Sequence, residues 1–284
     1  MTARIIKGKE IADIIKQEVA SRIQSIKNEK GISPTIATIM IGDNPESSLY
    51  LKLRDKACKD VGIFSKRVIF DESVTEHVLL DKIKKLNIDS SVHGILVQLP
   101  LPSHISQQKL FSTLSPVKDV EGFTPWNLGS LLNAEEHIVP CTPLAVLKIL
   151  EHEKISCKGK NIVIVNHSLV VGKPLAALFL NRDATVSVCH VFTQSMKSFT
   201  KNADILVSAA GVPRLITADL IKEDAVVIDV GIVKTDTGIC GDVDEHSVKE
   251  KASLLTPVPG GVGPVTVACS LSNMQKTIHQ SIQE

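Results

Sequence analysis

The stretch from Lys160 to Arg182, KNIVIVNHSLVVGKPLAALFLNR, constrains the fold more than any other part of the chain. Ile162–Val165 is an apolar, β-branched run, which is typical of a parallel strand covered on both faces. Asn166–Ser168 interrupts this run, and apolar residues resume after Gly172 and Pro174. Proline suits the first turn of a helix because its missing N–H would be unpaired there. The order predicts a buried strand, a polar loop and a helix.

A loop of this kind can bind a phosphate. Where a loop leaves the carboxyl end of a strand and enters a helix, it presents N–H groups and the positive end of the helix dipole to an anion. The dinucleotide fingerprint G-x-G-x-x-G is absent, because Asn166 stands at its first glycine position. The stretch therefore fits a nucleotide site and also an ordinary strand–helix loop, since such loops occur on many folds.

Strands and helices alternate along the whole chain, which predicts parallel sheets with covering helices, the second half being a doubly wound nucleotide fold. Two segments rich in Pro and Gly, residues 115–129 and 256–266, are expected to be irregular loops. Thr142 is expected to cap a helix that starts with Pro143. The expected strands are 35–41, 66–70, 94–99, 161–165, 185–189, 205–209 and 226–230, and the expected helices 9–26, 47–61, 75–86, 105–114, 143–153 and 265–282.

A chain of 284 residues is long for one compact core, so two domains are expected. We place the N-terminal domain at residues 1–140, completed by the C-terminal helix 265–284. The nucleotide domain then spans residues 141–264. The predicted fold class is α/β, with a parallel sheet in the first domain and a Rossmann-like, doubly wound sheet in the second.

Composition narrows the classes of partner. With 32 basic and 31 acidic residues the net charge is +1, which does not favour nucleic acid or an anionic membrane surface. Six cysteines without C-x-x-C spacing argue against a structural zinc site and a secreted disulfide scaffold, so we expect no metal and a reducing cytoplasm. No targeting segment or membrane span is apparent. The expected partner is a small molecule.

Four separated segments, IGDNPESSLYLKLRDKACKDVGI, HGILVQLPLP, VKDVEGFTPWNLG and TPVPGGVGPVTVA, resemble the bifunctional methylenetetrahydrofolate dehydrogenase/cyclohydrolase family. The resemblance implies an N-terminal α/β domain and a nucleotide domain with folate bound in the cleft between them, in a homodimer. It also implies oxidation of 5,10-methylenetetrahydrofolate with NADP, followed by hydrolysis of the methenyl product to 10-formyltetrahydrofolate.

The resemblance also implies roles for individual residues. Tyr50 matches a tyrosine that lies against the folate, and Gln98 a glutamine that hydrogen-bonds the catalytic lysine. Gly261 and Pro264 match a loop that closes over the folate, and Thr266 the end of that loop near the nicotinamide. The expected catalytic residues are Tyr50, Arg54 and Gln98; the substrate site adds Leu99, Glu121, Gly261 and Pro264; the cofactor site comprises Thr142, Asn166, His167, Ser168, Gly172, His190, Ile232 and Thr266.

The chain departs from the family pattern at three places. Arg54 stands where the family has a lysine, Glu121 replaces the aspartate of DVDG, and Asn166-His167 replaces a glycine often followed by arginine. An arginine stays protonated and cannot act as a general base. We therefore expect dehydrogenase activity with reduced cyclohydrolase activity.

The cofactor preference follows from the end of the second nucleotide-domain strand. Val188–Val191 contains no carboxylate to bind an unphosphorylated ribose, so NADP is favoured and NAD remains possible. His167 and His190 are the expected partners of the 2′-phosphate. Two alternatives stay open: a non-catalytic folate- or nucleotide-binding subunit, and an NAD-dependent amino-acid or hydroxy-acid dehydrogenase with the same two-domain plan.

Overall fold

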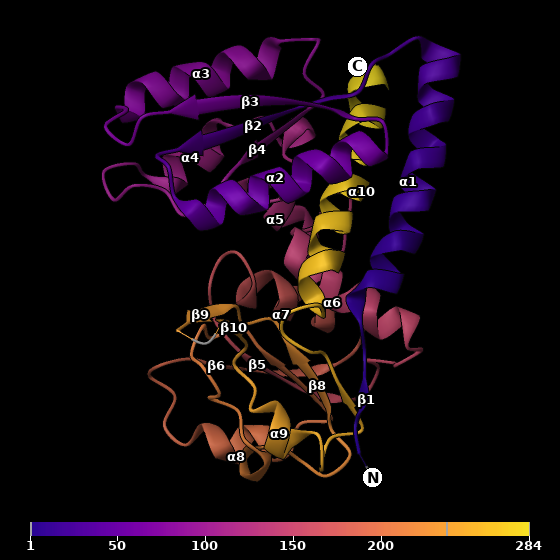
Figure 1. Ribbon diagram of the computed structural model, residues 1–284, viewed down its shortest axis with the longest axis vertical. Coiled ribbons are helices and arrows are strands. Elements are labelled where there is room, and N and C mark those ends of the chain that lie inside the picture. Colours follow the sequence, from indigo (N-terminus) through magenta and orange to yellow (C-terminus); the bar gives the residue numbers. More distant parts are fainter. Residues whose placement is uncertain (1, 237, 284) are drawn as a thin grey trace. The chain divides into compact units, whose positions relative to one another are not determined.

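The computed structural model describes residues 2–236 and 238–283, and their side chains except at positions 45–47, 49, 50 and 281–283. The chain forms two compact units, which we call the six-strand unit and the three-strand unit after their sheets (Figure 1). The six-strand unit contains residues 1–13, 131–135 and 140–269, and the three-strand unit residues 14–130, 136–139 and 270–284. The expected domain limits, 1–140 with 265–284 and 141–264, stay a prediction.

The six-strand unit is built on a fully parallel sheet of order β1-β11-β8-β7-β5-β6. Because β5 lies between β6 and β7, successive connections run to opposite sides of it, and the carboxyl ends of these strands form the switch point where α/β sheets bind ligands. The predicted doubly wound sheet is thereby confirmed. Its strands are β1 Arg4–Ile5, β5 Asn161–Val165, β6 Thr185–Cys189, β7 Ile205–Ser208, β8 Val226–Asp229 and β11 Leu254–Leu255.

Helices cover this sheet because their apolar residues form one buried stripe. In α7, Leu175, Leu178 and Phe179 are fully buried, and the helix packs on β5 and β6. The other elements of the unit are α6 Cys141–His152, α7 Gly172–Leu180, α8 Met196–Thr200, η2 Ala218–Leu220, α9 Glu245–Val248 and the hairpin β9 Val233–Thr235 and β10 Gly238–Cys240.

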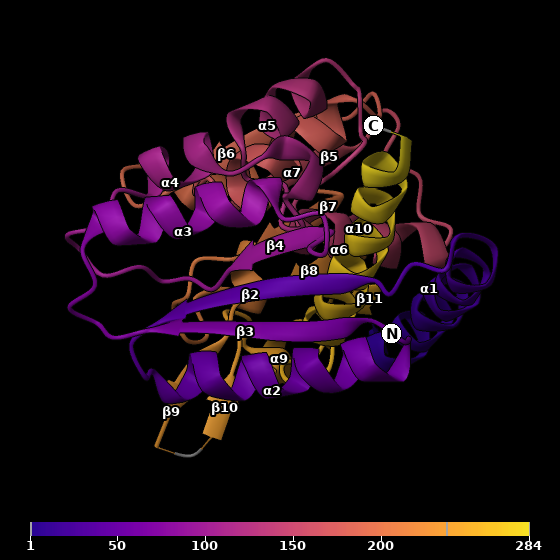
Figure 2. The same ribbon diagram turned by 90° about the horizontal axis from the view of Figure 1, so that it is seen from above.

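The three-strand unit has a parallel sheet of order β3-β2-β4, with α2 and α3 flanking its strands (Figure 2). The central strand β2 is buried along almost its whole length, as its apolar sequence TIATIMI predicts. The elements are β2 Thr35–Ile41, α2 Pro45–Asp60, β3 Phe64–Phe70, α3 Glu76–Ile88, β4 Gly94–Val97, α4 Gln107–Thr113, η1 Pro116–Lys118 and α5 Pro125–Leu132. Two long helices, α1 Gly8–Lys30 and α10 Val262–Gln283, contribute residues to both units.

Two expected loops contain helices. Within residues 115–129, η1 and the start of α5 are helical, because Pro125 occupies the first position of α5 and the Thr124 hydroxyl accepts the N–H of Asn127 (3.3 Å). The last helix, α10, begins at Val262 and not at Val265. Pro264 is its third residue, where a helix needs no intrahelical N–H bond.

The expected cap of α6 is also wrong. The helix begins at Cys141 with Pro140 as its N-cap residue, so Thr142 is the second helical residue and makes no capping bond. Elsewhere the predicted strands and helices match the observed ones to within a few residues. In the described part of the chain, no helix has the length and apolar character needed to cross a bilayer.

Candidate active site

Two of the expected site residues that depart from the family pattern contact each other. Arg54, on α2, donates from Nη2 to Oε1 of Glu121 (3.3 Å). The Arg54 side chain is 4% exposed and that of Glu121 17% exposed, so the pair is largely withdrawn from solvent. Cys58, one turn further along α2, is fully buried, and burial raises the pKa of its thiol to about 12, which excludes a thiolate nucleophile.

The loop that carries Glu121 is held by two buried charged residues. The Asp119 carboxylate accepts the N–H groups of Gly122 (2.9 Å) and Thr124 (2.7 Å) and the amide of Asn127 (3.0 Å). Lys118 donates from Nζ to the carbonyls of residues 86 and 89 (3.1 and 2.8 Å). Burial raises the pKa of Asp119 and lowers the pKa of Lys118. Both side chains are occupied in building the loop, which presents Glu121.

Gln98 follows β4, and its backbone N–H continues the sheet by donating to Ile39 O (2.8 Å). Its side chain donates from Nε2 to the carbonyl of Leu99 (3.0 Å). Its Oε1 is buried and has no hydrogen-bond partner among the described residues, which marks it as an acceptor for a bound molecule or a moving side chain. Tyr50 lies on α2, but its side chain is outside the described part of the structure.

The Pro/Gly loop that contains Gly261 belongs to the six-strand unit. Gly261 N donates to Pro257 O (2.9 Å), and a Cβ at Gly261 would lie 2.5 Å from the same oxygen, so only glycine fits. Gly8, at the start of α1, donates its N–H to Gly260 O (2.8 Å). Pro264 is half-buried in the first turn of α10. Packing against α1 therefore fixes the backbone of this loop.

Asn166 organises the loop between β5 and α7. Its Oδ1 accepts the N–H groups of Ser168 (2.7 Å) and Gly172 (3.1 Å), and its Nδ2 donates to Ala209 O (2.6 Å) after β7. A Cβ at Gly172 would lie 2.2 Å from the Asn166 carbonyl oxygen, which explains the glycine. The Ser168 hydroxyl accepts the N–H of Val171 (3.1 Å). The Asn166 side chain thus fixes the loop conformation by hydrogen bonds, whereas a glycine-rich loop is shaped by close approach of its backbone segments.

This loop corrects the expectation of free N–H groups at the helix start. The N–H of Gly172 is bound by Asn166, that of Lys173 by Ser168 O (3.0 Å), and Pro174 has none. The donors nearest the start of α7 are therefore used inside the loop. A phosphate held here has to be bound by the preceding segment, at His167 and Ser168, and by side chains of neighbouring strands.

His167 and His190 lie together at the switch point. Their ring centroids are 4.7 Å apart, because Val165 and Cys189, the last residues of β5 and β6, are paired neighbours. Both histidines are exposed. Nδ1 of His190 accepts the N–H of Phe192 (3.2 Å), so the proton of the neutral ring lies on Nε2, which can donate to a ligand. The structure therefore brings these two predicted residues together at the carboxyl ends of β5 and β6.

The other three expected cofactor residues lie on separate elements of the six-strand unit. Thr142 is half-buried on α6, Ile232 is 64% exposed after β8, and the Thr266 hydroxyl donates to Val262 O (3.3 Å) within α10. Among the described residues, no three His, Cys, Asp or Glu side chains gather as a metal site requires.

Comparison of the sequence with known proteins identifies the family of this chain. The chain matches the catalytic domain of tetrahydrofolate dehydrogenase/cyclohydrolase over residues 6–121 and the NAD(P)-binding domain over residues 140–282. It is 49% identical over 280 residues to the bifunctional protein FolD of Methanosarcina mazei, with 99% of this chain and 98% of that protein covered. The chain belongs to the tetrahydrofolate dehydrogenase/cyclohydrolase family.

Solved structures of the family superpose on the whole chain. The bifunctional enzyme FolD of Campylobacter jejuni is 44% identical with a TM-score of 0.95, covering 98% of this chain and 99% of that one. The Trypanosoma brucei methylenetetrahydrofolate dehydrogenase-cyclohydrolase, crystallised with NADP cofactor and inhibitor, is 35% identical with a TM-score of 0.95 over the full length of both chains. The resemblance predicted from four sequence segments is confirmed.

In this member of the family, the loops after β7 and β8 are held by two buried carboxylates that sequence reasoning missed. Asp242 accepts the Ser208 hydroxyl (2.8 Å) and the N–H groups of Ala210 (2.5 Å) and Val212 (3.0 Å). Asp229 accepts the N–H groups of residues 231, 242 and 243 at 3.0, 3.1 and 2.9 Å. Ile232 follows directly on the backbone that Asp229 holds.

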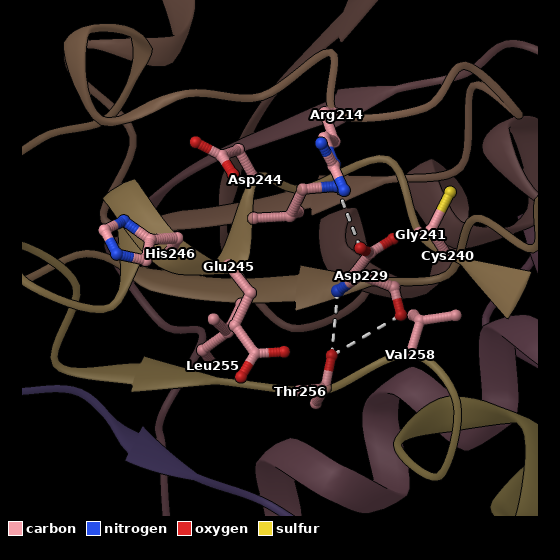
Figure 3. A pocket seen from close by; sticks show the side chains of 11 residues that line it. Arg214, Asp229, Cys240, Gly241, Asp244, Glu245, His246, Leu255, Thr256 and Val258 are labelled. Carbon is pink, nitrogen blue, oxygen red and sulfur yellow. Dashed lines mark hydrogen bonds between the residues drawn. The ribbon is translucent and has the colours of Figure 1, made fainter. Parts of the chain in front are cut away.

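A cavity of about 290 Å³ lies beside this network (Figure 3). Asp229 and Thr256 form one side of it, joined by the Asp229 N–H to the Thr256 hydroxyl (2.8 Å), while Glu245 and His246 come from α9. Burial, with a smaller repulsion from Asp242, raises the pKa of Asp229 to about 6. A signal for these carboxylates existed in the sequence, since VVIDVG and CGDVD each place an aspartate within two residues of a glycine, but its meaning depends on the fold.

Proposed function

We propose that this protein oxidises 5,10-methylenetetrahydrofolate to 5,10-methenyltetrahydrofolate with NADP, and hydrolyses the product to 10-formyltetrahydrofolate. One observation carries the proposal: both halves of the family, the catalytic domain and the NAD(P)-binding domain, match in order along one chain. The bifunctional names of relatives that cover nearly its whole length support the same assignment.

The residues of the six-strand unit fit a nicotinamide dinucleotide phosphate. NADP, when bound, would accept a hydride from the substrate. The exposed imidazoles of His167 and His190, at the ends of β5 and β6, provide donors for a ribose phosphate. No carboxylate follows β6 within His190–Thr193 to bind the free hydroxyl of NAD. The hydrogen bonds of Asn166 fix the loop against which the dinucleotide would lie.

The residues of the three-strand unit fit the substrate. Glu121 offers a carboxylate, which suits the adjacent N–H donors of an amino-pyrimidinone ring. Gln98 offers the buried acceptor Oε1. Hydride transfer needs orientation of the reacting carbon more than it needs a protein acid or base. These side chains, together with the predicted contacts of Leu99 and Tyr50, would supply that orientation.

The hydrolysis differs from hydride transfer because it requires proton transfer to and from water. A lysine can serve this step when burial and neighbours bring its pKa towards neutrality, whereas Arg54 remains protonated. Arg54 can stabilise developing negative charge but cannot accept a proton. We therefore expect the native chain to have a cyclohydrolase rate at least about 10²-fold lower than that of Arg54→Lys, which is the usual effect of losing an acid–base group.

The assay that tests the function supplies 5,10-methylenetetrahydrofolate with NADP and measures NADPH formation, then follows methenyltetrahydrofolate decay after subtraction of its spontaneous rate. NADPH formation is expected in the native chain, and a gain in hydrolysis on Arg54→Lys. Folate binding without NADPH formation would instead indicate a non-catalytic binding subunit. Turnover of amino or hydroxy acids, but not of the folate, would indicate the other alternative.

We also propose that the enzyme is a cytoplasmic homodimer. Strand β3 is an edge of its sheet in the described chain, and its apolar residues Phe64 and Ile69 are 64% and 57% exposed. An exposed apolar edge strand is a surface that proteins normally cover. Light scattering should give twice the chain's mass for the native protein and the single mass for Ile69→Lys. A monomeric native protein would contradict the proposal.

A further inference from the structure

The two positions at which the catalytic half departs from its family pattern lie 67 residues apart in sequence and touch each other in the fold. We propose that Arg54 and Glu121 form one coupled unit, in which Arg54 is a positioning residue for the carboxylate that binds the substrate's pterin ring. The inference rests on the proposed function, since it takes the folate as the ligand of Glu121. It explains why both substitutions occur together in this chain.

The first step is that neither backbone is free to adjust. Helix α2 is anchored by Leu51, Ala57 and Cys58, whose exposures are 2%, 4% and 0%. The loop around Glu121 is anchored by the three hydrogen bonds to Asp119 and by insertion of the buried Lys118. The separation of the two side-chain origins is therefore set by the fold.

The second step is the reach of the side chains. Nη2 of Arg54 and Oε1 of Glu121 are 3.3 Å apart, so they meet only at the limit of hydrogen bonding, longer than the ~2.7–2.9 Å of a tight charge-assisted bond. Lysine is about one bond shorter than arginine, and aspartate one methylene shorter than glutamate. Either replacement alone would open the contact, whereas the arginine and the glutamate together span it.

The third step is what the contact does to the carboxylate. Glutamate has one more rotatable bond than aspartate, so a glutamate without a contact would lose more freedom on gripping a ligand. Nη2 of Arg54 donates to Oε1, and the two oxygens of a carboxylate together offer about four lone-pair sites. Glu121 can thus be oriented by Arg54 and still receive the N–H donors of the pterin. The longer side chain of Arg54 thus holds the longer side chain of Glu121 in a position from which it can bind the pterin.

The experiment is a double-mutant cycle over the native chain, Arg54→Lys, Glu121→Asp and the double variant. The readouts are the dissociation constant of tetrahydrofolate and the KM for methylenetetrahydrofolate in the NADP reaction. We expect Glu121→Asp to weaken binding by at least tenfold when Arg54 is present, and by less than threefold when lysine stands at position 54. Arg67→Lys, at the more exposed ion pair between Arg67 and Asp55, is the matched control and should leave both constants unchanged.

If the fold-change in the dissociation constant of the double variant equals the product of the fold-changes of the two single variants, the coupling is overturned. Equal weakening of kcat with unchanged dissociation constants would overturn it too, because a positioning role for a binding carboxylate has to appear in affinity. The tetrahydrofolate measurement needs no turnover. Absence of NADPH formation in the native chain would therefore contradict the proposed function and leave the coupling readable from the binding cycle alone.

Discussion

At the scale of single residues, Glu121 is the carboxylate on which substrate affinity is expected to depend. It is 17% exposed, and the buried Asp119 is occupied in holding the loop. Replacing Glu121 by Gln keeps the shape and removes the charge, which weakens hydrogen bonds from the pterin by about 1.5–3 kcal/mol. We expect a rise of more than about tenfold in KM for the folate substrate. Glu135→Gln, on an exposed surface position, should leave KM unchanged.

The histidine pair leads to a prediction about cofactor choice. The two exposed imidazoles offer donors to a 2′-phosphate, whereas the free ribose hydroxyl of NAD finds no carboxylate at this strand end. The value of kcat/KM for NADP is therefore expected to exceed that for NAD. His190→Asp should shift the preference towards NAD, because a carboxylate accepts the ribose hydroxyl and repels the phosphate. An unchanged preference in His190→Asp would show that other groups select the cofactor.

At the scale of elements, the β5–α7 loop shows one side chain replacing a backbone motif. Asn166→Ala removes three hydrogen bonds and leaves the N–H groups of Ser168 and Gly172 without their acceptor. We expect a loss of about 1–3 kcal/mol in the free energy of unfolding and a raised KM for NADP. Asn166→Asp keeps the acceptor and should lose less. Unchanged stability with a raised KM would mean that Asn166 acts by touching the cofactor directly and not through the loop.

At the scale of the whole molecule, the buried Asp229 links stability to pH. Its pKa is raised from 3.8 to about 6 in the folded state, so the folded protein binds this proton more tightly than the unfolded chain does. Its contribution to stability is therefore fully present below about pH 4 and is lost as the pH rises through 6. A shift of this size corresponds to about 3 kcal/mol.

Urea unfolding of the native chain and of Asp229→Asn at several pH values checks this. The stability of the native chain relative to the variant should fall by a few kcal/mol between pH 4 and pH 7. Asp219→Asn is the control, because Lys197 and Thr217 lower the pKa of Asp219 to about 2 and its effect should be constant over this window. A constant difference for Asp229→Asn as well would show that its carboxyl does not titrate there.

The sequence by itself determined the α/β class, most element positions and the family. Hydrophobic periodicity depends on neighbours within a few residues, so the strand of Ile162–Val165 and the amphipathic α1 could be read directly. Short motifs such as VQLPLP and the Pro/Gly loop identified the family, because their backbone demands leave little choice of residue. The same Pro and Gly misled at α5 and at the start of α10, since proline begins a helix as readily as it ends one.

Only the tertiary structure decided what the polar residues do. Arg54 and Glu121, Asn166 and Ala209, and Ser208 and Asp242 are each more than 30 residues apart in sequence, and no local pattern pairs them. A carboxylate such as Asp119 or Asp229 reads as a possible catalytic acid in the sequence. In the fold it is a buried acceptor of loop N–H groups, because burial is tolerated only where hydrogen bonds replace water. Long-range packing sets which side chains lose water, and that loss decides their role.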